Sequence, residues 1–200
     1  MIIGLHGADH TGKHTLAQVL VEDFGYTHIR FDSTAESMLY QMNPMIHAGL
    51  AIEGGVGIMR LRSLVDQMGW ARAKSDYEEI TRLLDQTTMA TRDCIGPDAV
   101  IESVLQNYTP SQKYIITDLN YPEEFDSVIL RRGVLVYVTR PGVADHSHDA
   151  IFDFTLSNDG TLAEWQDQAL ALVKDAADLV TRRSTEISPQ GGFTSHFGMR

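Results

Sequence analysis

The chain has 200 residues, of which 43% are hydrophobic and 22% are charged, and its formal net charge is −11 at pH 7. This length and composition favour one soluble globular domain with a buried core, and no apolar run approaches the length of a membrane span. The acidic balance argues against nucleic acid as a partner, because nonspecific binding to phosphates needs a basic surface. Cys94 is the single cysteine, which excludes an internal disulfide and favours a cytoplasmic location.

A glycine-rich loop follows the first apolar run of the chain. Residues 2–6 read as a buried strand, residues 7–15 fit the phosphate-binding pattern G-x-x-x-x-G-K, and a helix is expected from about Lys13. In such a P-loop, backbone N–H groups and the helix N-terminus face a polyphosphate, so the sequence predicts a site for ATP. The alternative is a glycine-rich turn with a solvated lysine. The residues expected to bind the nucleotide here are Gly7, Asp9, His10, Thr11, Gly12, Lys13, His14 and Thr15.

Strands and helices are expected to alternate along the rest of the chain. Strands are predicted over residues 26–31, 113–118, 134–138 and 152–156. One helix is predicted to start after Asp32 or Ser33 and to stop before Pro44, and others over about 58–68, 76–94, 97 onward, 122–132 and 161–181. Proline and glycines over 43–57 predict a mobile connection, and residues 184–200 are expected to form a loose tail. The alternation predicts an α/β fold with a parallel sheet of about five strands flanked by helices.

Polar side chains follow several of these strands and should meet the P-loop at one edge of the sheet. Asp118 ends an apolar strand, so we expect it to bind Mg²⁺ together with Thr15, although it could instead cap the helix near Pro122. Asp32 could orient an acceptor hydroxyl or bind the substrate's sugar, or it could be a helix N-cap. Lys13 and Arg140 are expected to stabilise the transferring phosphoryl group, and we predict catalytic roles for Lys13, Arg140 and Asp32.

Two further groups of residues are candidates for binding. The turn after the last strand, with Asn158, Gly160 and Thr161, could lie against the nucleotide base, or it could be an ordinary turn with Thr161 as N-cap. On the helix over 76–94, a phosphate of the substrate could be bound by Arg82, Gln86 and Arg92. The alternative for Arg82 is a solvated helix face with salt bridges. The run of His and Asp over 145–149 reads as a loop rather than a zinc site.

Taken in order, several short motifs resemble the deoxynucleoside monophosphate kinases of tailed bacteriophages, within the P-loop nucleoside monophosphate kinase superfamily. The resemblance extends over about residues 1–175. Its pieces are the P-loop with G-K-H-T, Phe31-Asp32-Ser33, Gly69-Trp70 with Ala73-Lys74, Arg82-Leu83-Leu84, Thr88 with Arg92, Ile116-Thr117-Asp118 with Tyr121-Pro122 and Glu124, Arg140-Pro141-Gly142, and Asn158-Asp159-Gly160-Thr161.

The resemblance implies transfer of the γ-phosphoryl group of ATP, with Mg²⁺, to a deoxynucleoside 5′-monophosphate. It also implies a kinase domain over residues 1–183, with a helical substrate-binding region over about 33–110 and a short lid over 140–149. Small-molecule nucleotides would be the partners, and a homodimer is compatible with the chain. A phage origin would place the protein in the host cell cytoplasm.

The chain departs from the family pattern where positive charge is usual. Asn120 replaces an arginine common two residues after the strand-end aspartate, and Glu36 lies where a basic residue is usual. Either Arg60, Arg62 and Arg72 compensate, or the acceptor is different. The alternatives are therefore a P-loop kinase of another small acceptor, such as a modified nucleotide or a dephospho-coenzyme-A-like compound, and a nucleotide-binding protein without transfer activity.

Overall fold

The computed structural model describes residues 1–52, 55–143 and 151–186. In these ranges no helix is both long enough and apolar enough to cross a membrane. The centre of the molecule is a five-stranded sheet in the order β2-β5-β1-β6-β7, and every neighbouring pair of strands is parallel. The strands are β1 (Ile2–His6), β2 (Thr27–Ile29), β5 (Tyr114–Ile116), β6 (Val134–Thr139) and β7 (Phe154–Ser157).

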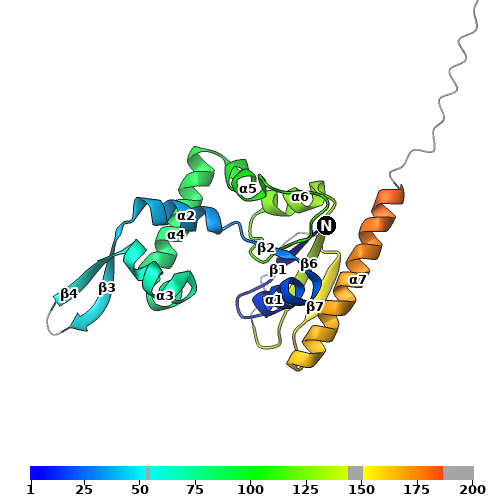
Figure 1. Cartoon of the computed structure of the whole chain (residues 1–200), viewed down its shortest axis with the longest axis horizontal. Helices are drawn as coiled ribbons and strands as arrows, with labels where there is room; N and C mark the ends of the chain where they lie inside the picture. The colour runs from blue at the N-terminus through cyan, green and yellow to red at the C-terminus, as the bar shows by residue number, and fades with distance from the viewer. Residues whose placement is uncertain (53–54, 144–150, 187–200) are drawn as a thin grey trace, which may run out of the picture.

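Helices cover both faces of this sheet (Figure 1). Neighbouring residues of β1 point to opposite faces, so Ile3 packs among side chains of α1 (Lys13–Phe24) and α7 (Leu162–Glu186). Ile2 packs on the other face against α5 (Pro97–Leu105) and α6 (Pro122–Leu130). This three-layer α/β architecture is the predicted one, and the near-continuous burial of β1, β5 and β6 is the reason that their sequences are apolar throughout.

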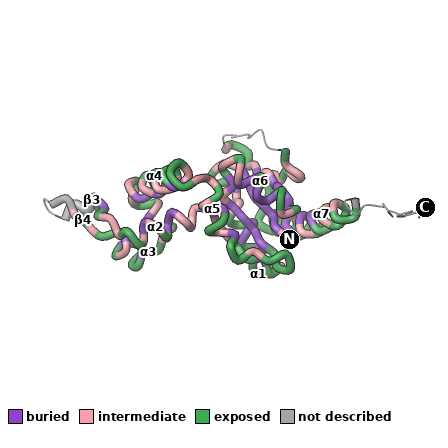
Figure 2. The backbone as a smooth tube through the Cα atoms, turned by 90° about the horizontal axis from the view of Figure 1, so that it is seen from above, coloured by how far each residue is buried: buried purple, intermediate pink, exposed green. Residues whose placement is uncertain are grey.

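Residues 33–94 form an arm that extends away from the sheet (Figures 1 and 2). It consists of α2 (Ser33–Met42), the hairpin of β3 (Met45–Ile52) and β4 (Gly55–Arg60), α3 (Leu61–Asp76) and α4 (Glu78–Cys94). The arm has its own apolar core. The fully buried members of that core are Ile46, Leu61, Leu64, Ala73 and Ile80.

The structure corrects the predicted connection over residues 43–57. β3 and β4 pair there as an antiparallel hairpin, with Met45 opposite Arg60 and a register shift between Ala48 and Ile52. Gly49, Gly55 and Gly57, which suggested a loop, therefore belong to an antiparallel ribbon. The predicted helix end at Gly69 corresponds to a break inside α3, since Gly69 has φ 76° and ψ 162° and the helix continues beyond it to Asp76.

The predicted lid and the predicted C-terminal tail fall partly outside the described residues. Most of the expected lid over 140–149, including the run from His146 to Asp149, lies outside them. Of the expected tail over 184–200, residues 184–186 belong to α7 and the rest lies outside the described ranges.

Candidate functional site

The loop between β1 and α1 is held in the shape of a phosphate cradle. Gly7 has φ 145° and Gly12 has φ 102°, and a Cβ at Gly7 would collide with the carbonyl oxygen of Val138 on β6. The Thr11 hydroxyl is buried and donates to the Ala8 carbonyl at 2.8 Å, which closes the loop internally. Since α1 starts at Lys13, its first backbone N–H groups have no helical partners and face outward at this loop.

The side chain of Lys13 turns back onto its own loop. Its Nζ donates to the carbonyls of Gly7 and Ala8, at 2.5 and 2.7 Å. Burial lowers the pKa of Lys13, and the nearby charges of Asp9 and Asp118 offset only part of that effect. The ammonium group is therefore already at the centre of the loop, among acceptors that a polyphosphate could replace.

The P-loop forms one wall of a cleft of about 360 Å³ between the sheet and the arm. The cleft places P-loop residues beside the acids that follow β2 and β5. Its charged lining consists of the cations Lys13, Arg30 and Lys74 and the carboxylates Asp9, Asp32, Asp85 and Asp118, and its other lining residues include Gly7, His14, Thr81, Thr88 and Asn120.

Asp32 and Asp118 are linked through the backbone. The Asp32 N–H donates to Asp118 Oδ2 at 2.9 Å. Neither carboxylate caps a helix: Asp32 is at the N-cap position of α2 but its side chain makes no capping bond, and α6 is capped by Tyr121 and Glu124 instead. Burial, reinforced by the charge of Asp32, raises the pKa of Asp118 to about 7.

One oxygen on each of these acids has no hydrogen-bond partner. Within the described ranges, Oδ1 of Asp32 and Oδ1 of Asp118 are shielded from solvent and accept no hydrogen bond. Carboxylate oxygens are ligands that Mg²⁺ prefers, so the donor set of this cleft suits that ion. Thr15, the other predicted metal ligand, is exposed and is not part of the cleft wall, whereas His14 is.

Arg140 and Asn158 reach the P-loop from the far ends of β6 and β7. Arg140 Nη1 donates to the His10 carbonyl at 3.2 Å, and Asn158 Nδ2 donates to the Thr11 carbonyl at 2.9 Å. A Cβ at Gly12 would collide with that same amide. The carboxyl ends of the strands thus bring the P-loop, Asp32, Asp118, Arg140 and Asn158 to one edge of the sheet.

The turn after Asn158 serves the start of α7. The N–H and the hydroxyl of Thr161 both donate to Glu164 Oε2, at 2.7 and 2.9 Å, and Gly160 packs against the same glutamate. The Glu164 N–H in turn bonds the Thr161 hydroxyl at 3.3 Å. Thr161 is therefore a helix cap, which is the second of the two interpretations of this turn.

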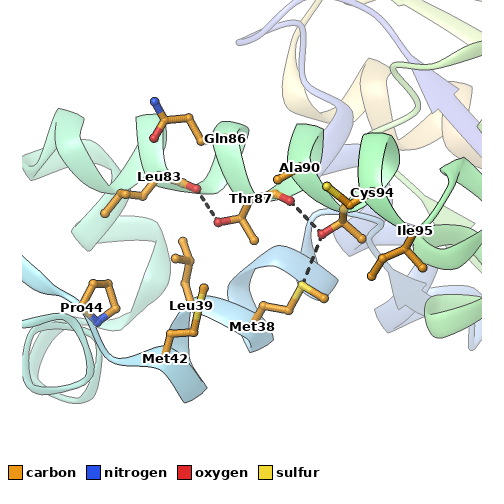
Figure 3. Close-up of a pocket in the computed structure, with 11 residues that line it drawn as sticks. Met38, Leu39, Met42, Pro44, Leu83, Gln86, Thr87, Ala90, Cys94 and Ile95 are labelled. Carbon is orange, nitrogen blue, oxygen red and sulfur yellow. Dashed lines mark hydrogen bonds between the residues drawn. The ribbon is translucent and has the colours of Figure 1, made fainter.

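The structure does not bring Arg82, Gln86 or Arg92 into the cleft. Arg82 is 65% exposed and lies 3.8 Å from Glu79. Gln86 is among the lining residues of an apolar groove of about 540 Å³ between α2 and α4, which also include Met38, Leu39 and Met42 (Figure 3). The arginines suggested as compensation are also engaged elsewhere on the arm: Arg60 with the Asn43 carbonyl, Arg62 with the Tyr40 carbonyl and Arg72 with Asp76.

Arg92 instead fastens α4 to α6. Its Nη2 donates to Glu123 at 2.6 Å, and its guanidinium lies 3.6 Å from the ring centre of Tyr121. Glu124, 3.5 Å from Arg92, accepts the backbone N–H groups of Asn120 and Tyr121. This joint therefore shapes the loop between Asp118 and α6 at the root of the arm.

Two cations in the cleft were not among the predicted site residues. Arg30 follows β2, and Lys74 comes from the part of α3 beyond the break at Gly69. The position of Arg30 two residues before Asp32 was a usable signal, because residues after a parallel strand reach the same edge of the sheet. The sequence predicts a helix end at Gly69, but it does not predict that α3 continues beyond the break and brings Lys74 to the cleft.

Comparison with known proteins adds little beyond the fold. No family model matches the chain, and no curated protein matches it in sequence. The crystal structure of shikimate kinase from Aquifex aeolicus aligns with 88% of this chain and 98% of its own chain, at a TM-score of 0.41 and 12% identity. A likeness of that degree concerns the general course of the chain and says nothing about its substrate.

Proposed function

We propose that this protein is an ATP-dependent phosphotransferase. The proposal rests on one observation: Lys13 of the P-loop lines the same cleft as Asp32 and Asp118. The P-loop can bind the phosphates of a nucleoside triphosphate, and the two carboxylates beside it can contact an acceptor. A protein that only binds a nucleotide would need the P-loop, but it would not need the part of the cleft that Asp32 and Asp118 line.

The chain's own residues suit transfer by positioning and electrostatics. Lys13 would leave the Gly7 and Ala8 carbonyls for the β- and γ-phosphates, and the N–H groups at the start of α1 would add to that binding. Arg140, next to the His10 carbonyl, would stabilise charge on the moving phosphoryl group. Asp32 would orient the acceptor. Arm and sheet face each other across the cleft, so approach of the arm would exclude water from the reaction.

Magnesium would be bound by the free Oδ1 of Asp118, with phosphate oxygens and water completing the shell. It would neutralise charge on the β- and γ-phosphates. Asp118 would then be ionised, because a bound cation opposes the burial that raises its pKa.

We propose a deoxynucleoside 5′-monophosphate as the acceptor, giving the diphosphate and ADP. The support is the series of short motifs shared with phage deoxynucleoside monophosphate kinases, from the P-loop to Asn158-Asp159-Gly160-Thr161. Asp118 and Lys74 belong to that series and line the cleft.

A kinase of a neutral hydroxyl acceptor is the second candidate, because of one observation about charge. Arg30 and Lys74 are both already paired with Asp32 and Glu36. The acceptor side of the cleft thus has no unpaired cation in its described lining, so a phosphate there would have to displace a carboxylate, whereas a neutral acceptor would not. A carboxylate such as Asp32 is suited to orient a hydroxyl group.

The test is ADP release from Mg-ATP with each common deoxynucleoside and ribonucleoside monophosphate, and with acceptors that carry hydroxyl groups but no phosphate, such as the parent nucleosides. Lys13→Ala should lower kcat/KM by about 100-fold or more, since it removes a charged contact to the transferring group. Lys174→Ala, an exposed lysine on α7, is the matched control and should leave turnover unchanged.

The outcome decides between the candidates. Turnover with deoxynucleotides that is lost in Lys13→Ala supports the monophosphate kinase. Turnover confined to hydroxyl acceptors without a phosphate supports the second candidate. ATP binding with no acceptor-dependent ADP release would leave a binding protein and sink the transferase proposal.

A further inference from the structure

The arm contributes a single cation to the described lining of the cleft. Its lining residues there are Lys74, Thr81, Leu84, Asp85 and Thr88. Arg82 points to solvent beside Glu79, and Arg92 is fastened to α6. An anionic acceptor held by the arm therefore has Lys74 as its cationic contact, with Arg30 on the sheet side of the same wall.

Lys74 and Arg30 belong to a closed square of charges with Asp32 and Glu36. Lys74 Nζ lies 3.3 Å from Asp32 and 3.0 Å from Glu36. Arg30 lies 3.4 Å from Asp32 and 2.5 Å from Glu36. Each cation thus touches both acids, so the square holds the two cations side by side and fixes their direction before any ligand binds.

The two acids of the square differ in exposure. The side chain of Glu36 is 7% exposed, whereas that of Asp32 is 38% exposed. Releasing Glu36 from its cations would leave a buried, unpaired charge, which is costly. Releasing Asp32 costs less, because its carboxylate can be hydrated or can contact another partner in the cleft. Asp32 is therefore the partner that an incoming anion can replace.

We infer that Lys74 and Arg30 form the binding site for the phosphate group of a phosphate-monoester acceptor, which takes the place of Asp32 on both cations. The inference rests on the proposed phosphotransferase function and names the acceptor-binding residues within it. Exchange of one carboxylate for a phosphate leaves Glu36 in place and puts the acceptor beside the P-loop. Asp32, once released, is free to contact the acceptor's hydroxyl groups.

The experiment compares acceptors with and without a phosphate. Binding of each deoxynucleoside monophosphate, its parent deoxynucleoside and ribose 5-phosphate is measured by calorimetry in the full chain, together with acceptor and ATP KM values. The variants are Lys74→Met, Lys74→Arg and Arg72→Met. Arg72 is the matched control, because it is a 72% exposed cation on the same helix, paired with Asp76.

Lys74→Met should weaken binding of the monophosphates by about 10- to 100-fold, because it removes a charged hydrogen bond. Binding of the parent nucleosides and the KM for ATP should stay within about twofold, as expected when one acceptor contact is lost. Lys74→Arg should restore part of the phosphate preference, and Arg72→Met should behave as the wild type. A general loosening of the fold would instead weaken nucleoside and nucleotide alike.

Each other result has a definite meaning. Turnover with a deoxynucleotide whose affinity is unchanged by Lys74→Met overturns the inference and leaves the kinase standing. Binding of ribose 5-phosphate that depends on Lys74, without deoxynucleotide turnover, supports the site and removes the deoxynucleotide function. If no monoester binds in a Lys74-dependent way, the inference is wrong.

Discussion

Asp118 is the residue in the cleft whose ionisation is most opposed by its surroundings. Burial and the neighbouring charge of Asp32 raise its pKa from 3.8 to about 7, and Oδ1 has no partner within the described residues. A side chain held in this way is destabilising for the empty protein and useful once a cation is bound. Function and stability therefore make opposite demands on this position.

The sign of that effect is testable through pH. The folded protein binds the Asp118 proton more tightly than the unfolded chain, so stability falls as pH rises from 3.8 to about 7 and then levels off. Asp118→Asn removes this dependence. Without Mg²⁺, the variant should melt at a higher temperature than the wild type above pH 7 and at the same temperature below pH 3.8.

Asp126→Asn is the control for this comparison, since Asp126 is exposed on α6. It should follow the wild type across the pH series of melting curves. Equal melting temperatures for Asp118→Asn and wild type above pH 7 would show that Asp118 ionises without cost, contrary to the expectation.

The sequence was informative for residues that follow strands and misleading for residues on the arm. Asp32 and Asp118 could be placed because parallel strands end at one edge of the sheet. Arg82 and Arg92 lie on one helix, and only tertiary packing decides which face of that helix meets the cleft. In the structure Arg82 faces solvent beside Glu79 and Arg92 pairs with Glu123, so neither side chain lines the cleft. Charge alone could not reveal that Arg92 pairs with α6.

At the scale of elements, the break in α3 is what brings Lys74 to the cleft. Gly69 has φ 76° and ψ 162°, a region open essentially to glycine, and no atom lies within 4 Å of a Cβ built there. Backbone conformation, rather than space, therefore requires glycine. The part of α3 after the break runs in a new direction and ends at Asp76, close to the start of α4.

Gly69→Ala should lower the free energy of unfolding by about 1–3 kcal/mol, because alanine is strained in this conformation. Urea denaturation measures the loss. Gly25→Ala is a useful comparison: Gly25 also has a positive φ, 69°, but in the left-handed helical region that other residues tolerate better, so its loss should be smaller. An unchanged urea midpoint for Gly69→Ala would show that the break in α3 does not require glycine, contrary to the expectation.

Elements of the sheet were predictable from periodicity, whereas the hairpin was not. Continuous apolar runs identified β1, β5 and β6, and helical spacing identified α4. The strands β3 and β4 contain Gly49, Gly55 and Gly57, residues that are depleted in strands and typical of loops. Their pairing comes from contact with each other and with α3 and α4, which local sequence does not display.

At the scale of the whole molecule, the arm and the sheet have separate apolar cores (Figure 2). The cleft lies between them. Among the described residues, the ionic links between them are the square around Lys74 and the joint of Arg92 with Glu123 and Glu124. Of these contacts, the one between Lys74 and the partly exposed Asp32 can be exchanged for another partner, whereas Glu36 and Glu124 are buried. Such links permit a change in the angle of the arm while the two cores stay intact.

Addition of a non-hydrolysable ATP analogue and an acceptor together should therefore make the molecule more compact. The radius of gyration from small-angle X-ray scattering should fall, because the arm closes on the ligands and excludes water. Either ligand alone should have a smaller effect. Turnover accompanied by an unchanged radius of gyration would show that the cleft works without closure.

Cys94 gives this chain a built-in attachment point for following such motion. It is the one cysteine of the sequence, it is exposed, and it lies at the end of α4 beside the groove shown in Figure 3. A maleimide fluorophore would label the natural protein at a single place on the arm, with no cysteine to remove and none to introduce. Changes in its emission could then be timed during a single turnover.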